Sequence, residues 1–144
     1  MRLLDYKFKT QIKVRNYEID WQGIVHNSNY LLYFETGRIE YLKNINVEID
    51  LNTIQNDQRV VLVRNEINYK SPAKFDELLN VYTRISKIGN TSFIFEGMLI
   101  EELTQRVVTE NVAYHVWLKP HTEEPMTVPD SFREKVKAFE GTLP

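Results

Sequence analysis

The 144-residue sequence contains no cysteine, and this absence removes several kinds of site at once. Disulfide bonds, catalysis by a thiolate and zinc sites with cysteine ligands are all excluded. The same absence is a weak indication of a reducing compartment.

The sequence also lacks a long apolar run and an excess of basic charge. Its first residues, MRLLDYKFKTQ, contain no stretch long enough for a signal peptide or a membrane-spanning helix. The formal net charge is -2, so the charge balance does not point to nucleic acid or to an anionic lipid surface. We therefore expect a cytoplasmic protein with neither a nucleic acid nor a membrane as partner.

Motifs of several common enzyme classes are missing. There is no G-x-S-x-G nucleophile motif, no P-loop and no glycine pattern of a dinucleotide-binding fold. The three histidines, His26, His115 and His121, do not have the spacing of metal ligands, and no H-E-x-x-H occurs. His115 alternates with Ala113 and Trp117, which is typical of a structural residue on a strand face. We expect neither a metal nor a cofactor.

The length and composition predict one globular domain that spans residues 1–144. Hydrophobic residues make up 42% and charged residues 26% of the chain, and both values are ordinary for a globular domain. A chain of this size buries roughly 68–70% of its unfolded surface, which is enough for a hydrophobic core.

Hydrophobic periodicity predicts one long helix among five strands. Alternating apolar and polar residues indicate strands over residues 8–19, 60–69, 78–88, 92–103 and 107–118. Apolar spacings of three and four indicate a helix over residues 27–44, and a short helix begins at residues 129–131. Residues 46–58 are predicted to form a loop with at most one helical turn. Short connections make the last three strands an antiparallel meander, so we expect an α+β fold with the sheet wrapped around the long helix.

Three features of the long helix require a particular environment. Gly37 in its middle predicts close approach of a strand, because glycine is otherwise unfavourable there. The helix is apolar over so much of its surface that we expect it to be deeply covered. Glu35 and Arg38 are three residues apart and are expected to pair on the surface, or to be drawn inward at an interface.

One stretch combines an acid with the start of this helix. Asp20 stands in the turn between the first strand and the helix, six residues before His26. Asn27 and Ser28 are good helix N-caps, because their side chains accept hydrogen bonds from the first turn's free N–H groups. Those groups and the helix dipole attract a carbonyl oxygen or an oxyanion. Asp20 is therefore a base or nucleophile beside such a site, or a plain turn residue.

The same stretch carries a pattern, D-x-x-G-x-V-x-N-x-x-Y-x-x-x-F-E-x-x-R, formed by Asp20, Gly23, Val25, Asn27, Tyr30, Phe34, Glu35 and Arg38. It resembles the hotdog-fold acyl-CoA thioesterases of the 4-hydroxybenzoyl-CoA thioesterase type. The resemblance continues through INYKSPAKFDELL, RISKIGNTSFIF and MTVPDSFREKV, in the same order and over nearly the whole chain. It implies a hotdog fold and a homodimer, or a homotetramer built from dimers, with active sites at the protomer interface.

The resemblance also implies catalytic roles. Asp20 would be the general base or nucleophile of thioester hydrolysis, and the backbone N–H near Asn27 would polarise the thioester carbonyl. Gly23 would permit the conformation of the turn. His26 is either a helper of this chemistry or a partly exposed residue of the first helical turn. Glu35 is a second carboxylate candidate, with the pair to Arg38 as the alternative.

Substrate contacts follow from the same resemblance. Tyr30 and Phe34 are expected to line the acyl pocket, and Arg84, Lys87 and Ser92 lie where relatives often contact the nucleotide of coenzyme A. Lys70 and Lys74 are further candidates, and each lysine is equally well explained as a solvated strand residue. The predicted function is acyl-CoA thioesterase. The alternatives are an acyl-ACP thioesterase with the same catalytic residues, or a non-catalytic hotdog module that binds acyl-CoA.

Overall fold

The computed structural model describes residues 1–56 and 59–143. The strands are β1 (Phe8–Lys13), β2 (Val60–Tyr69), β3 (Leu78–Ile88), β4 (Ser92–Glu101) and β5 (Val107–Trp117). The helices are α1 (Asn27–Asn44), α2 (Leu51–Asn56) and α3 (Asp130–Glu140), with 3-10 turns at Leu3–Asp5 and Asn16–Glu18.

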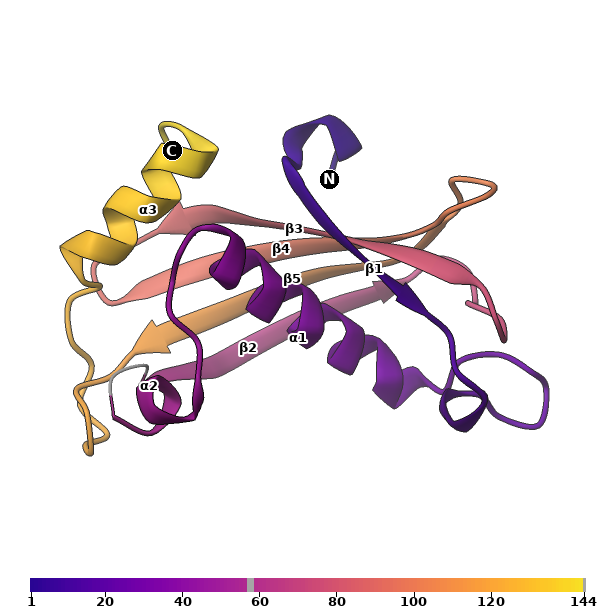
Figure 1. Ribbon diagram of the computed structural model, residues 1–144, viewed down its shortest axis with the longest axis horizontal. Coiled ribbons are helices and arrows are strands. Elements are labelled where there is room, and N and C mark those ends of the chain that lie inside the picture. The colour runs from indigo at the N-terminus through magenta and orange to yellow at the C-terminus, as the bar shows by residue number, and fades with distance from the viewer. Residues whose placement is uncertain (57–58, 144) are drawn as a thin grey trace.

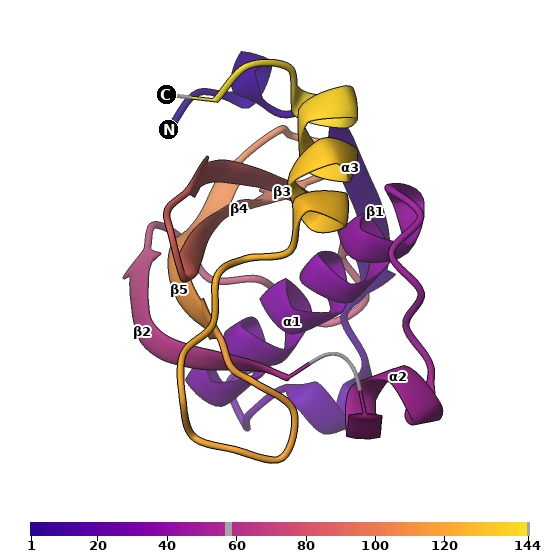
Figure 2. The same cartoon turned by 90° about the vertical axis from the view of Figure 1, so that its left-hand side faces the viewer.

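The five strands form one antiparallel sheet in the order β1-β3-β4-β5-β2. The meander predicted for the last three strands is confirmed as β3-β4-β5, and β1 and β2 are the two edges. The sheet curves, and α1 lies along its concave side (Figures 1 and 2). This is the predicted hotdog arrangement of one long helix wrapped by an antiparallel sheet, with α3 as the short C-terminal helix.

The long helix has the bounds that the periodicity predicts. At Gly37 the backbone of the helix packs directly against side chains of β3. A Cβ atom on Gly37 would lie 2.5 Å from Val81 Cγ1 and 2.8 Å from Thr83 Oγ1, both on β3. A Cβ on Gly97 of β4 would lie 2.7 Å from the Phe34 ring. The predicted reason for Gly37 is therefore confirmed, because a methyl group would hold the helix away from β3.

The core divides along α1 into two main clusters. Tyr30, Tyr33 and Phe34 pack with Val81 and Leu99 around the first half of the helix. The second cluster surrounds Tyr41, whose ring contacts aromatic rings of β1, β4 and α3.

The last helix, α3, is joined to this second cluster by two hydrogen bonds. Glu140 of α3 accepts a hydrogen bond from the Tyr41 hydroxyl at 2.8 Å and another from the backbone N–H of Ile85 at 3.1 Å. The C-terminal helix thus completes the core at one end of α1.

Three strand ends differ from the prediction. β4 ends at Glu101 and not at Leu103, and β5 ends at Trp117 and not at Leu118. The first strand ends at Lys13 and not at Ile19, because Val14 bonds to the turn before β3, donating to Glu77 O at 2.9 Å. The chain then forms the 3-10 turn, where the Glu18 carboxylate accepts from the N–H of Arg15 at 2.7 Å. The predicted loop 46–58 contains one short helical segment, α2, as the prediction allowed, and its residues 57 and 58 lie outside the described part of the chain.

The expectation that α1 is deeply covered is wrong for its outward face in the single chain. Leu31 is 39% exposed and Leu32 is 55% exposed. Among the residues that the structure describes, no helix is both long and apolar enough to cross a membrane.

The close contact under Gly37 yields a test of the fold. We expect Gly37→Ala to lower the free energy of unfolding by about 1–3 kcal/mol, since Val81 is β-branched and cannot yield easily. Helix propensity alone predicts the opposite sign. Asn44→Ala, at an exposed position at the far end of the same helix, is the control and should be neutral or stabilising. Chemical denaturation measures both, and a Gly37→Ala protein more stable than the wild type would contradict the close contact.

Candidate active site

Asp20 begins a tight turn whose backbone is fixed at both ends. Its N–H donates to Ile24 O at 2.9 Å, and its carbonyl accepts from the N–H of Gly23 at 3.1 Å. Gly23 has a φ of 80°, a left-handed conformation in which a side chain is strained. The predicted role of Gly23 in shaping the turn thus has a direct conformational reason.

The helix begins one residue after His26, which is its N-cap. The His26 side chain, the first of the three candidates for the helix start, accepts from the Ser28 N–H, with Nδ1 3.3 Å from the amide nitrogen, and the side chains of Asn27 and Ser28 do not act as the cap. The same Nδ1 lies 2.8 Å from Ser28 Oγ. Asn27 is the first helical residue, and its own N–H has no partner among residues 1–56 and 59–143. A free donor therefore stands at the positive end of α1.

The acidic turn and the helix start are held together through Glu18. The Glu18 carbonyl accepts from the His26 N–H at 3.0 Å and from the Asn29 side-chain amide at 2.8 Å. On the other side, Val25 donates to Ala73 O at 2.9 Å. These bonds fix the turn that carries Asp20 with respect to the first turn of α1.

The Asp20 side chain is exposed to solvent in the single chain. Its Oδ1 accepts from the Gln22 N–H at 2.7 Å, so one oxygen serves the turn, as the alternative interpretation predicts. The other oxygen has no hydrogen-bond partner in the described part of the chain. A carboxylate with one oxygen bound and one free is oriented and still available for chemistry.

A cavity of about 250 Å³ lies beside Asn27, between the start of α1 and the end of β2. Its walls are Ile24, Val25, Asn27, Tyr30, Tyr69, Lys70, Ser71 and Pro72. The buried Tyr30 hydroxyl accepts from the Ala73 N–H at 3.0 Å, and burial raises the pKa of Tyr30. Asp20 is not one of the lining residues, so one chain alone does not enclose acid and amide in one cleft.

The other predicted substrate residues lie apart from this cavity. Phe34 is buried against Gly97 in the core. Arg84 forms an ion pair with Glu96, at 2.7 Å, on the sheet face opposite α1. Lys87 is exposed, and Ser92 starts β4, where its carbonyl accepts from the Gly89 N–H at 2.7 Å. Of the predicted cations only Lys70 lines the cavity beside Asn27, and the roles of the others stay predictions.

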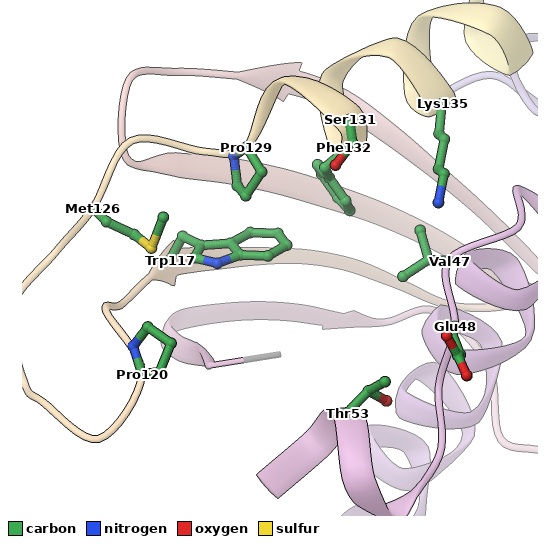
Figure 3. Close-up of a pocket in the computed structure, with 10 residues that line it drawn as sticks. All are labelled: Val47, Glu48, Thr53, Trp117, Pro120, Met126, Pro129, Ser131, Phe132 and Lys135. Carbon is green, nitrogen blue, oxygen red and sulfur yellow. The ribbon is translucent and has the colours of Figure 1, made fainter. Parts of the chain in front are cut away.

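Two larger hollows lie at the other end of α1. An open cleft of about 380 Å³ lies between α2 and α3 (Figure 3). A second cavity of about 420 Å³ lies between α1 and the sheet and shares Trp117 and Phe132 with the cleft. Its polar lining residues are Glu35, Arg38 and His115, and its other walls are Ile39, Leu42, Ile49, Ile54, Val60, Leu62, Phe93, Phe95, Trp117 and Phe132. We call this second space the α1 cavity.

The predicted pair of Glu35 and Arg38 does not form, since no ion pair joins them among the described residues. Arg38 turns instead towards β5, where it donates to Asn111 Oδ1 at 3.4 Å, and burial lowers its pKa. His115 is 9% exposed. Burial, together with the nearby Arg38 guanidinium, lowers the pKa of His115 to about 4, so the ring is neutral at pH 7.

Sequence reasoning missed this grouping of Arg38 and His115. A histidine that alternates with Ala113 and Trp117 on one strand face was the available signal. Its partner on α1 is 77 residues away in the chain, so only the fold brings the two together. In the described part of the chain, no three His, Cys, Asp or Glu side chains form a group that could hold a metal ion.

Comparison with known proteins identifies relatives along most of the chain. A family model described as the thioesterase-like superfamily matches residues 14–136. The long-chain acyl-CoA thioesterase FadM of Escherichia coli is 30% identical over 90% of this chain and 96% of its own length. The acyl-acyl carrier protein thioesterase ATL3 of Arabidopsis thaliana is 27% identical over 91% of this chain and 68% of its own length.

A solved structure agrees with these sequence relatives. A Thermus thermophilus thioesterase, crystallised with coenzyme A and zinc, superposes with a TM-score of 0.81 at 25% identity. The match covers 96% of this chain and 98% of the other.

The bond from Asn29 to Glu18 gives a test of how the site is held. We expect Asn29→Ala to cost about 1 kcal/mol of stability and to loosen the turn next to it. Hydrogen exchange at the His26 amide should accelerate more than exchange in β4. Asn44→Ala, at the exposed far end of the same helix, is the control. Equal protection of His26 in both variants would mean that the Asn29 side chain does not hold the turn.

Proposed function

The chain belongs to the thioesterase-like superfamily, and from this we propose that it hydrolyses the thioester of an acyl-CoA to a free acid and coenzyme A. The family prediction and that of a thioester hydrolase made from the sequence are thus confirmed, while substrate and catalytic residues belong to the proposal. The observation that carries it is the free Asn27 amide at the start of α1, held beside the turn of Asp20 through the Glu18 carbonyl.

The chemistry assigns one role to each group. The Asn27 N–H donates to the thioester oxygen and stabilises the negative charge that develops there, an effect typically worth ~10²–10³ in rate. The free Asp20 oxygen takes a proton from the attacking water, or attacks the carbonyl itself. The C–S bond breaks, and the thiolate of coenzyme A leaves and takes up a proton. His26 acts as the cap that orders the helix start.

The site needs a second protomer, and the sheet edges indicate where it binds. The β1 edge carries Lys9 and Lys13, charges of the kind that prevent edge-to-edge association. The β2 edge carries the mutually paired Arg64 and Glu66, and it exposes Leu62 at 47% and Val63 at 59%. On α1, Leu31 and Leu32 are exposed as well. We place the homodimer interface along β2 and the outward face of α1.

Two-fold pairing of β2 with its copy is antiparallel, so opposite ends of the strand meet. The Tyr69 end lines the cavity beside Asn27, and the Val60 end lines the α1 cavity. The dimer therefore sets the catalytic turn of one protomer against the α1 cavity of its partner. This arrangement encloses the otherwise exposed Asp20 and supplies room for an acyl group.

The carrier of the acyl group is the finer part of the proposal. We favour coenzyme A because FadM is named for acyl-CoA hydrolysis and the Thermus thioesterase binds coenzyme A. Lys70, beside Asn27, is a suitable cation for its phosphates. The Arabidopsis relative is named for acyl-ACP hydrolysis, so an acyl-ACP substrate is the alternative. Rates on matched acyl-CoA and acyl-ACP substrates separate the two, and binding without thiol release would indicate a non-catalytic module.

Replacement of the acid tests the chemistry. We expect Asp20→Asn to lower kcat at least ~100-fold on acyl-CoA while the oligomer and the thermal midpoint are kept. Asp130→Asn, an equally exposed aspartate in the first turn of α3, should retain full activity. Thiol release measured over short, long and aryl acyl-CoAs checks both. Wild-type turnover by Asp20→Asn would remove Asp20 from the mechanism.

Charges on the proposed interface test the dimer. We expect the double variant Leu32→Lys, Val63→Lys to be monomeric in sedimentation velocity, because like charges face each other across the two-fold axis. Its activity should fall at least ~10-fold with unchanged circular dichroism, since the acyl site loses its second half. Leu103→Lys, at a position 89% exposed in the β4–β5 turn, is the control. An active monomer would contradict a site shared between protomers.

A further inference from the structure

The connection between β2 and β3 joins the candidate site to the start of β5. Its residues 71–77 lie at the same end of the molecule as the chain between β1 and α1 (Figure 1). Hydrogen bonds link these residues to the turn of Asp20 on one side and to Arg106, the residue before β5, on the other. We call residues 71–77 the β2–β3 segment.

The turn of Asp20 and the start of α1 are both bonded to this segment. Ala73 accepts from the Val25 N–H at 2.9 Å and donates to the Tyr30 hydroxyl at 3.0 Å. The N–H of Phe75 donates to Gly23 O at 3.0 Å. A displacement of the segment would therefore displace the turn with it.

Arg106 holds the segment from the opposite side. In the described part of the chain, all of its side-chain hydrogen bonds end on this segment. Nε donates to Ser71 Oγ at 3.0 Å, and Nη2 donates to Pro72 O at 3.0 Å. Nη2 also donates to Glu77 Oε1 at 2.9 Å, and Nη1 lies 3.4 Å from Oε2. The planar guanidinium thus joins the two ends of the segment, which a single point charge could not do.

The pair of Arg106 and Glu77 is sheltered from water. The two side chains are 30% and 18% exposed, and a sheltered two-pronged pair is stronger and better oriented than a pair of exposed ions. Glu77 is fixed in addition by the Lys74 N–H, which donates to Oε1 at 2.7 Å, and by the Val14 N–H, which donates to its carbonyl at 2.9 Å. Arg106 therefore binds an anchor that is itself immobile.

The cavity wall next to the segment is held independently of the guanidinium. The backbone N–H groups of Lys70 and Ser71 both donate to Val108 O, at 2.9 and 3.1 Å. The Ser71 hydroxyl donates to Val107 O at 2.7 Å while it accepts from Arg106, so it is fully engaged in structure. Loss of the guanidinium should thus disturb the turn of Asp20 more than it disturbs Lys70.

We propose that Arg106 is a positioning residue of the candidate active site, which fixes the turn of Asp20 relative to the Asn27 amide through the β2–β3 segment. Arg106 does not line the cavity beside Asn27 and has no contact with substrate in this proposal. Its effect on the turn is independent of the proposed function, whereas its effect on turnover rests on that function. A misplacement of about 1 Å in such a site can cost on the order of 10²-fold in rate.

Arg106→Lys tests the positioning without any hydrolysis. Lysine keeps the charge and can pair with Glu77, but it cannot reach both ends of the segment at once. The reporter amides are those of Val25 and Phe75, which bond between the turn and the segment. Their hydrogen exchange should accelerate at least ~10-fold relative to amides of β4. Unchanged protection at both reporter amides would overturn the proposal.

Arg133→Lys is the matched control. The Arg133 guanidinium also spans several acceptors, since it donates to three backbone carbonyls at distances between 2.7 and 3.1 Å. It belongs to α3, at the opposite end of the molecule (Figure 1). This variant should lower the thermal midpoint as Arg106→Lys does, but leave the reporter amides and kcat at wild-type values. Equal acceleration of the reporter amides in both variants would indicate a general loss of stability and overturn the proposal.

Kinetics on acyl-CoA substrates give the second readout. Arg106→Lys should lower kcat at least ~10-fold and change KM less than ~2-fold, because β5 still holds Lys70. A raised KM with wild-type kcat would mean that Arg106 serves substrate binding, and would contradict positioning. Faster exchange of the reporter amides with wild-type kcat would also overturn the proposal, since the order of the turn would then not matter to the reaction.

The two readouts separate this proposal from the hydrolase proposal. Absence of thiol release by the wild-type protein would refute the activity, whereas faster exchange in Arg106→Lys would still support the positioning of the turn. If Arg106→Lys does not fold, Glu77→Gln takes its place, because Arg106 then keeps its bonds to Ser71 and Pro72. The reporter amides should accelerate about 3-fold in this milder variant, and unchanged protection there would overturn the proposal.

Discussion

The close packing of α1 on the sheet, in which a glycine on each side leaves no room for a side chain, is the constraint on which the other features depend. Gly37 lets the helix approach Val81, and Gly97 lets the Phe34 ring approach the backbone of β4. With the helix fixed at two points, its first turn has one position relative to the end of β2. The Asn27 amide and the Glu18 carbonyl that holds the Asp20 turn are then placed by the core rather than by loop contacts alone.

The same constraint leaves space at the opposite end of the helix. There α1 separates from β2 and β5, and the α1 cavity lies between them with Arg38 and His115 in its walls. Acid and cavity are thus at opposite ends of one helix in one chain. A two-fold axis perpendicular to β2 is the simplest operation that reunites them, because it reverses the direction of the neighbouring copy.

Much of this fold could be predicted from residue patterns, because they are local. Helical spacing and a helix start near His26 gave the bounds of α1, and strict alternation gave β2 and β3. The end of β1 could not be predicted, since Val14 pairs with a turn more than sixty residues away, at Asp76 and Glu77. Residue preference favours Asn27 and Ser28 as caps, whereas a nitrogen of His26 performs this role. Arg38 and His115 line one cavity only because the sheet curves around α1, which no spacing along the chain encodes.

The bonds of Glu140 to Tyr41 and to the Ile85 amide have a consequence for how the protein is made. A ribosome releases the long helix and most of the sheet well before residue 140 leaves the exit tunnel. Until then the Tyr41 hydroxyl and the Ile85 amide lack the carboxylate that pairs with them, and the aromatic cluster beside α3 stays open to water. This end of the core therefore closes only after residue 140 has been made and α3 has docked on the Tyr41 cluster.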